Sequence, residues 1–151
     1  MKNMTNAKAR AAGKRDLRRG FKDCRFLDAL TLNEQDAPAP DAFIYYYNKA
    51  RDGQVGNYVV YEVVASDVTH RADDAVFARD FFAQVDVFSV KSFESKLLSE
   101  TLARLEEKLT EAGFEVEAQG EDYEADTRLY HQAYFVSKLI SQGGKQDVGR
   151  H

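Results

Sequence analysis

The chain has 151 residues, of which 44% are hydrophobic and 30% charged, and these values are ordinary for one soluble globular domain. It contains no run of about 20 apolar residues and no apolar signal-peptide core, so we expect neither a membrane-spanning helix nor a secreted protein. Its single cysteine, Cys24, excludes an intramolecular disulfide. The net charge of the chain is −4, but residues 1–22 hold eight Lys or Arg and only one acid.

The N-terminal segment combines basic charge with small residues. Residues 1–14 lack apolar periodicity, so we expect a flexible basic arm. From Asp16 onward, helical spacing of apolar residues predicts an amphipathic helix that ends before Pro38. This spacing involves Leu17, Phe21, Cys24, Leu27 and Leu30. Candidate contacts to an acidic partner or nucleic acid are Lys8, Arg10, Lys14, Arg15, Arg18 and Arg19. The alternative is a solvated tail and helix face.

Two β-prone runs follow, at residues 43–47 and 58–65. The turn residues between them, Asp52-Gly53 and Gly56-Asn57, predict an antiparallel hairpin. The polar residues 66–76 predict a loop or an irregular extension between strands. The turn and the loop supply candidate assembly contacts, because loops at sheet ends often carry them. These candidates are Arg51, Asp52, Gln54, Asp67, His70, Arg71, Asp73 and Asp74.

The second half of the chain alternates between strand and helix patterns. Residues 81–88 predict a central strand, and a leucine stripe predicts a helix from an N-cap at Ser92 to a stop at Gly113. A brief strand at 114–116, a polar turn and a final strand at 129–140 complete the pattern. The expected fold is a single α+β domain over residues 15–140, a mostly antiparallel sheet with two main helices packed on one face. Residues 141–151 are expected to form a disordered tail.

Signals of catalysis are absent from the sequence pattern. His70, His131 and His151 stand at spacings that imply no shared site, so we expect no catalytic residues. The acidic clusters at 73–74 and 121–126 lack the ligand spacing of a calcium loop, which leaves no predicted metal site. The glycine pair at 143–144 follows the last strand instead of joining a strand to a helix, so no cofactor site is predicted.

Two blocks of sequence resemble the tail-terminator and tail-completion proteins of long-tailed bacteriophages. The first runs from the strand at 58–65 through Arg71-Ala72-Asp73-Asp74 to the segment Phe82-Ala83-Gln84-Val85-Asp86-Val87-Phe88-Ser89. In that family the third loop residue is often Asn, where this chain has Asp74. The second block is the helix at 92–112 followed by the segment 122–131, which is similar to a Tyr-Glu-x-Asp-Thr-x-x-Tyr-His turn. Together the blocks span about residues 43–140.

The resemblance implies a non-enzymatic structural protein of the virion. Such proteins form a ring, usually a hexamer, that caps the tail tube, ends its polymerisation and provides the docking surface for the head-tail connector. The implied partners are further copies of the chain, the tail tube protein and the connector or neck protein, with transient contact to transiting DNA and without a cofactor or membrane. The implied location is the head-proximal end of the tail, after synthesis in the host cytoplasm.

Three alternatives remain open. Another neck protein at the head-tail junction is a small ring with a related task. A nucleic-acid-binding module would use the basic arm, although the acidic remainder of the chain repels phosphate. A small enzyme would require a pocket that joins His70 or His131 to a carboxylate and a nucleophile.

Overall fold

The computed structural model describes residues 3–22, 44–50, 52, 56–64 and 69–141. Within these residues there are two helices, α1 (Asn6–Lys22) and α3 (Lys96–Glu111). The strands are β1 (Ile44–Tyr47), β2 (Tyr58–Val64), β3 (Thr69–Ala72), β4 (Ala75–Ser89), β5 (Glu115–Glu124) and β6 (Leu129–Ser141). The predicted tail at 141–151 lies outside the described residues except for Ser141, which ends β6.

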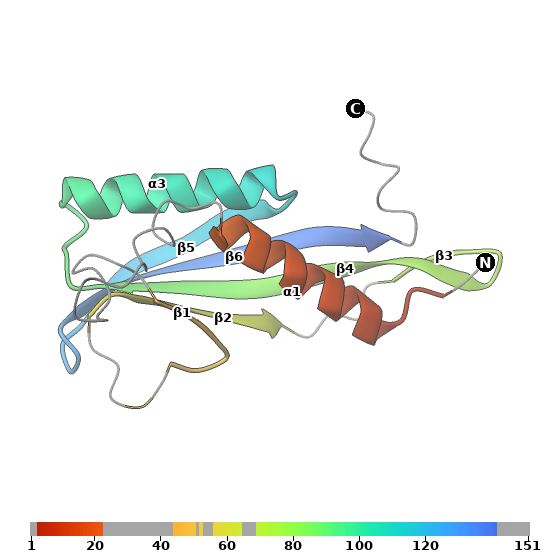
Figure 1. Ribbon diagram of the computed structural model, residues 1–151, viewed down its shortest axis with the longest axis horizontal. Helices are drawn as coiled ribbons and strands as arrows, with labels where there is room; N and C mark the ends of the chain where they lie inside the picture. The colour runs from red at the N-terminus through yellow and green to blue at the C-terminus, as the bar shows by residue number, and fades with distance from the viewer. Residues whose placement is uncertain (1–2, 23–43, 51, 53–55, 65–68, 142–151) are drawn as a thin grey trace, which may run out of the picture.

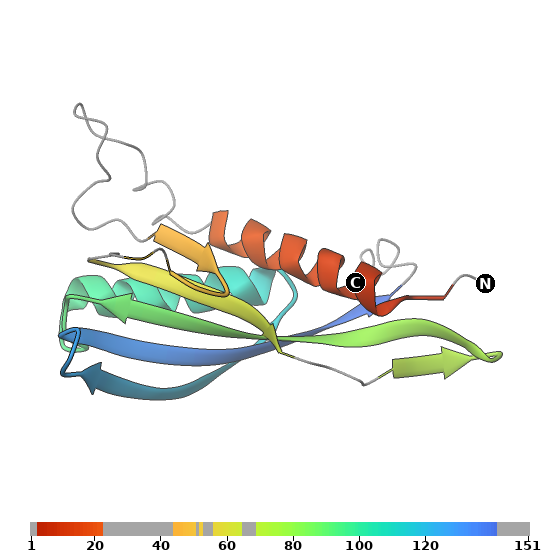
Figure 2. The same ribbon diagram turned by 90° about the horizontal axis from the view of Figure 1, so that it is seen from below.

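The strands form one sheet in the order β1-β2-β4-β6-β5, and β3 pairs with the first part of β4. Every pairing is antiparallel except that of β1 with β2. Figures 1 and 2 show α1 and α3 on the same face of this sheet, with β4 and β6 as its long central strands. The predicted fold class is therefore confirmed: a single α+β domain with a mostly antiparallel sheet and both described helices on one face.

The pairing of β1 with β2 is parallel, so the predicted hairpin is wrong. Ile44 lies opposite Tyr58, and Tyr47 lies opposite Tyr61. The connection contains two left-handed residues, Asn48 at φ 67° and Gly56 at φ 86°. Left-handed residues are typical of turns, and the parallel register places the start of β2 beside the start of β1.

Helix α1 begins at Asn6, so the predicted flexible arm is wrong for residues 6–14. Thr5 caps the helix, because its Oγ1 accepts the Lys8 N–H at 3.1 Å. The preceding residues are fixed to the sheet: the Met4 N–H donates to the Val76 carbonyl at 2.6 Å, and the Met4 side chain is buried. The predicted continuation of the helix beyond residue 22 lies outside the described residues.

A glycine allows α1 to lie close against the sheet. A Cβ built on Gly13 would fall 2.1–2.4 Å from three ring carbons of Phe81, which is itself buried in β4. No larger residue fits this contact without displacement of the ring or the helix. Gly13 therefore sets the distance between helix and sheet.

Residues 69–76 form a hairpin in place of the predicted loop. Asp73 and Asp74 both have positive φ, 51° and 64°, as in the two-residue turns that join antiparallel strands. Asp tolerates this conformation better than most non-glycine residues, which explains the turn. Figure 1 shows this hairpin extending beyond the ends of both helices.

Helix α3 confirms the helix that was predicted from the leucine stripe. Its start and the strand that follows it differ from the prediction. Its N-cap is Ser95, whose Oγ accepts the Leu98 N–H at 3.4 Å, and Ser92 instead opens the preceding turn. Gly113, at φ 99°, ends the helix as predicted. The predicted polar turn after residue 116 is instead most of β5, an edge strand whose exposed side chains hide any alternation.

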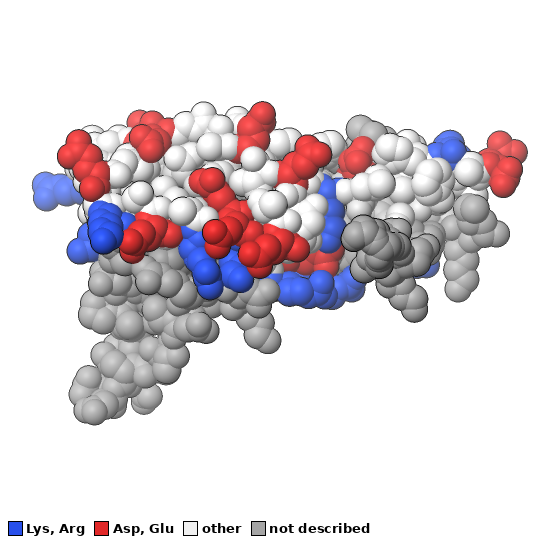
Figure 3. All heavy atoms as spheres, turned by 90° about the horizontal axis from the view of Figure 1, so that it is seen from above, with Lys and Arg blue, Asp and Glu red and all other residues white. Residues whose placement is uncertain are grey.

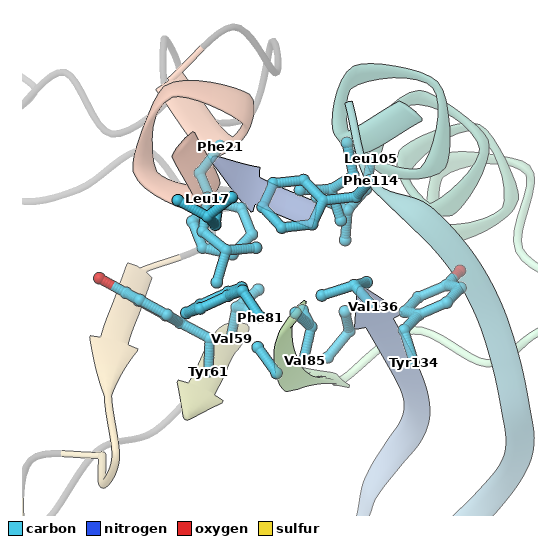
Figure 4. Close-up of a cluster of buried hydrophobic side chains, with 14 of the residues drawn as sticks. Leu17, Phe21, Val59, Tyr61, Phe81, Val85, Leu105, Phe114, Tyr134 and Val136 are labelled. Carbon is cyan, nitrogen blue, oxygen red and sulfur yellow. The ribbon is translucent and has the colours of Figure 1, made fainter. Parts of the chain in front are cut away.

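The core lies between the two helices and one face of the sheet. Figure 4 shows its centre, in which side chains from α1, α3 and the strands β2, β4 and β6 converge with Phe114, which precedes β5. Labelled members are Leu17, Phe21, Val59, Tyr61, Phe81, Val85, Leu105, Phe114, Tyr134 and Val136. At the edge of this core, polar contacts of Lys138 connect α1, the end of α3 and the sheet. The Lys138 ammonium on β6 lies 2.8 Å from the Asp16 carboxylate of α1 and 2.7 Å from the Ala112 carbonyl that follows α3.

Candidate functional site: the open face of the sheet

The face of the sheet opposite the helices carries side chains that no described helix covers. Side chains alternate along a strand, so residues between the buried core positions point to this second face. We call it the open face (Figure 2). Its residues on β1, β2 and β4 include Tyr46, Tyr58, Val60, Glu62, Val64, Asp80, Phe82, Gln84, Asp86 and Phe88. On β5 and β6 they include Glu115, Glu117, Asp122, His131, Ala133, Phe135 and Leu139.

Aromatic rings form a ladder across the open face. Tyr58 stacks on Phe88 with ring centroids 4.6 Å apart, and Phe88 stacks on His131 at 4.4 Å with the planes 7° apart. Tyr46 extends the row onto β1, with its centroid 6.3 Å from that of Tyr58. These rings are only half-buried. The ladder thus presents a continuous aromatic strip over β1, β2, β4 and β6.

A polar cluster lies beside the ladder. The His131 Nε2 lies 2.8 Å from Asp86 Oδ1, and the Gln84 amide donates to both Asp86 oxygens at 3.1 Å. The His131 Nδ1 lies 4.0 Å from a Glu124 oxygen. The hydrogen bond with Asp86 is the main cause that raises the pKa of His131, while burial opposes the shift.

The cluster favours the protonated form of His131, which is not suited to act as a general base. Carboxylates face both ring nitrogens of His131, and such neighbours stabilise the charged form. Burial is the largest cause that raises the pKa of Tyr58, which keeps its phenol neutral. Over the described ranges, no group of three or more His, Cys, Asp or Glu residues is placed to hold a metal ion. The arrangement is suited to fixing the shape and charge of a surface.

The predicted assembly-contact loops do not form one site. His70 and Arg71 lie on β3, and Asp73 and Asp74 form the tip of its hairpin, at the N-terminal end of β4. Asp52 precedes β2, whose first residue pairs near the C-terminal end of β4, so it lies at the other end of the sheet. Arg51, Gln54 and Asp67 lie outside the described residues.

The predicted basic contacts come together on α1, and we call them the α1 basic ridge. The ridge consists of Lys8, Arg10, Lys14, Arg15, Arg18 and Arg19. Lys8, Arg15, Arg18 and Arg19 are exposed, and the Lys14 ammonium lies 5.0 Å from the centroid of the Tyr47 ring. In Figure 3 most Lys and Arg lie toward the lower side of the view, where the helices are, while Asp and Glu also line the upper side, which borders the open face.

The aromatic ladder was missed from sequence because its strands carry apolar residues on both faces. In β2, for example, Tyr58 and Val60 alternate with Val59 and Tyr61, and only the position of the helices decides which pair is buried. The turn with left-handed φ at Arg128 brings His131 beside Phe88. The available signal was a possible pairing of Asp86, in the strand predicted to be central, with His131, in the predicted final strand.

Comparisons with known proteins give no family assignment. No protein-family profile matches the chain, and no curated protein matches it either. A search of the described residues found no helix with the length and apolar character needed to cross a membrane.

Proposed function

We propose that this protein is a structural subunit of a phage tail-terminator ring, which caps the tail tube, ends its polymerisation and docks the head-side connector. The observation that carries the proposal is the aromatic ladder of Tyr46, Tyr58, Phe88 and His131 on the open face. The phage role comes from the sequence resemblance of residues 43–140. The structure contributes a surface of the kind that an assembly protein requires.

Exposure of a half-buried aromatic strip to water is unfavourable in free energy. Each aromatic side chain has 150–250 Å² of surface to bury, and large contiguous apolar patches on soluble proteins commonly mark contact surfaces. Leu139, on the same face, remains 51% exposed. Contact with another protein would cover these side chains, which is what a ring subunit requires.

The long hairpin formed by β3 and β4 supports the same role. It extends beyond the helices (Figure 1), and its tip is fixed by the two left-handed residues Asp73 and Asp74. The segment before α1 braces it, since the Arg79 guanidinium donates to the Met4 carbonyl at 2.8 Å. A braced extension can reach a neighbouring subunit or the tube without first becoming ordered, which lowers the entropic cost of contact.

One observation favours a second candidate, a platform for single-stranded nucleic acid. Open sheets with exposed aromatic rings stack bases in several RNA-binding modules. The carboxylates of Glu62, Asp86, Glu117 and Asp122 on the same face oppose it, because binding of nucleic acid depends on cationic contacts to phosphate. Protein contact is therefore the stronger proposal.

The test is the mass of the protein in solution by light scattering over a range of concentrations, together with binding to purified tail tubes. We expect a ring, or a monomer that adds to tube ends. Leu139→Lys places a positive charge on the open face at an exposed position and should weaken assembly. Tyr123→Lys, at a 48% exposed position on the other face of the sheet, is the matched control. A monomer indifferent to tubes would refute the proposal.

A further inference from the structure

The open face carries negative charge as well as aromatic rings. The charged side chains that β2, β4, β5 and β6 place on it are carboxylates, apart from His131. Those whose positions the strand register fixes are Glu62, Asp80, Asp86, Glu115, Glu117, Asp122 and Glu124. A partner for this surface must therefore offer cations that also pack on aromatic rings.

The α1 basic ridge has that chemistry, and it lies on the opposite side of the same molecule. Four of its six residues are arginines, whose planar guanidinium groups both stack on aromatic rings and pair with carboxylates. Asp16, the one acid in the helix, is already engaged by Arg19 at 3.3 Å and by Lys138 at 2.8 Å. The outer side of α1 is therefore left strongly positive.

We propose that the open face of one subunit binds the α1 basic ridge of a second copy of this chain. This inference rests on the proposed function and names the two surfaces that join neighbours. Contact between two open faces, or between two ridges, would place like charges together, which costs several kcal/mol. The favoured contact is heterologous, the type that closes into a ring when the rotation between subunits allows it.

The dimensions of the two surfaces match. Glu62, Gln84, Phe135 and Glu117 lie in one row across β2, β4, β6 and β5. Three strand spacings separate the outer two residues by about 14 Å. Lys8 and Arg18, both exposed and ten residues apart, are separated by about 15 Å along α1. A helix laid along this row would place one cation near each carboxylate and its middle between Gln84 and Phe135.

A charge-swap experiment tests this contact with the full chain. One variant carries Lys8→Glu and Arg18→Glu, and the other carries Glu62→Lys and Glu117→Lys. We expect each variant alone to lose self-association, with an apparent dissociation constant raised about 100-fold or more. An equimolar mixture should assemble again, because the altered surface of each variant then meets the complementary surface of the other. Analytical ultracentrifugation gives the masses.

The control variant carries Lys91→Glu and Lys96→Glu, two exposed positions before and at the start of α3, and should assemble like the wild type. Restoration in the mixture also shows that both variants are folded. Wild-type assembly that both charge variants retain would overturn this contact and leave the ring proposal standing. A wild type that stays monomeric at all concentrations would overturn the contact too, and capping of tail tubes would then decide the proposed function separately.

Discussion

Gly13→Ala isolates the close approach of α1 to the sheet. The new Cβ would lie 2.1 Å from Cδ1, 2.3 Å from Cγ and 2.4 Å from Cε1 of the buried Phe81 ring. Rotation of the Phe81 ring about its Cβ–Cγ bond leaves Cγ in place, and Phe81 is buried, so a change of its χ1 rotamer has to displace packed neighbours. Overpacking of this kind costs about 1–3 kcal/mol, and we expect the upper part of that range. Alanine recovers about 1 kcal/mol through helix propensity, which leaves a net loss of about 1–2 kcal/mol.

The assay is urea denaturation followed by circular dichroism, and the same loss should lower Tm by roughly 2–8 °C. Gly120→Ala is the matched control, because a Cβ at Gly120 meets no atom within 4 Å. It should leave stability unchanged or raise it by up to about 1 kcal/mol. A Gly13→Ala variant as stable as the wild type would show that the helix-to-sheet distance is adjustable and that this account of Gly13 is wrong.

Two further predictions concern charged groups. Lys138→Met should lower the free energy of unfolding by about 2–3 kcal/mol, because it leaves the largely buried carboxylate of Asp16 without its main partner. Asp16→Asn in the same background should recover part of this loss. Urea denaturation of the two single variants and the double variant measures the coupling as a double-mutant cycle. The raised pKa of His131 stabilises the folded state fully below about pH 6.5, the unfolded value, and this stabilisation is lost as the pH rises through the folded-state pKa. His131→Gln should flatten this fall in the urea midpoint between pH 6 and 8, and an unchanged slope would contradict the assignment.

The fold class followed from sequence because the strongest patterns belong to the central elements. Leu98, Leu102, Leu105 and Leu109 recur at helical spacing and are all buried in α3. The strands β4 and β6 are long and contact neighbours on both edges, so their apolar residues are dense enough to recognise. These elements define the sheet and one of the two helices that cover it.

The start of α1 was missed because its buried side is made of small residues. Ala9 and Gly13 are the buried residues within positions 6–14, and neither is a large apolar residue, whereas Leu17 and Phe21 lie in the part that was predicted. Basic residues fill the outer positions, so the segment resembles a flexible arm in composition. The physical cause is the short distance between α1 and the sheet, which excludes large side chains and is invisible until β4 is in place.

The open face was not predicted from the sequence, and only the chemistry of the α1 basic ridge was. The cations of α1 were predicted from charge alone as candidate contacts, and the structure gathers them on one helix. The hairpin residues His70 to Asp74 were assigned to a loop, because left-handed turns at two consecutive Asp residues are uncommon. The open face required the sheet order, since Phe88 and His131 are 43 positions apart and meet only when β4 pairs with β6.

The fold places the basic residues of α1 and the carboxylates of the open face on different sides of the sheet. The positive charge of residues 1–22 lies on a helix over one face of the sheet, while the open face of the same sheet carries carboxylates. The two charges are therefore separated across the molecule instead of neutralising each other within it. In the contact proposed above, we expect this arrangement to repel a copy in the reversed orientation and to attract one in the same orientation. Such a directional preference would let a subunit add to the proposed ring in a single orientation.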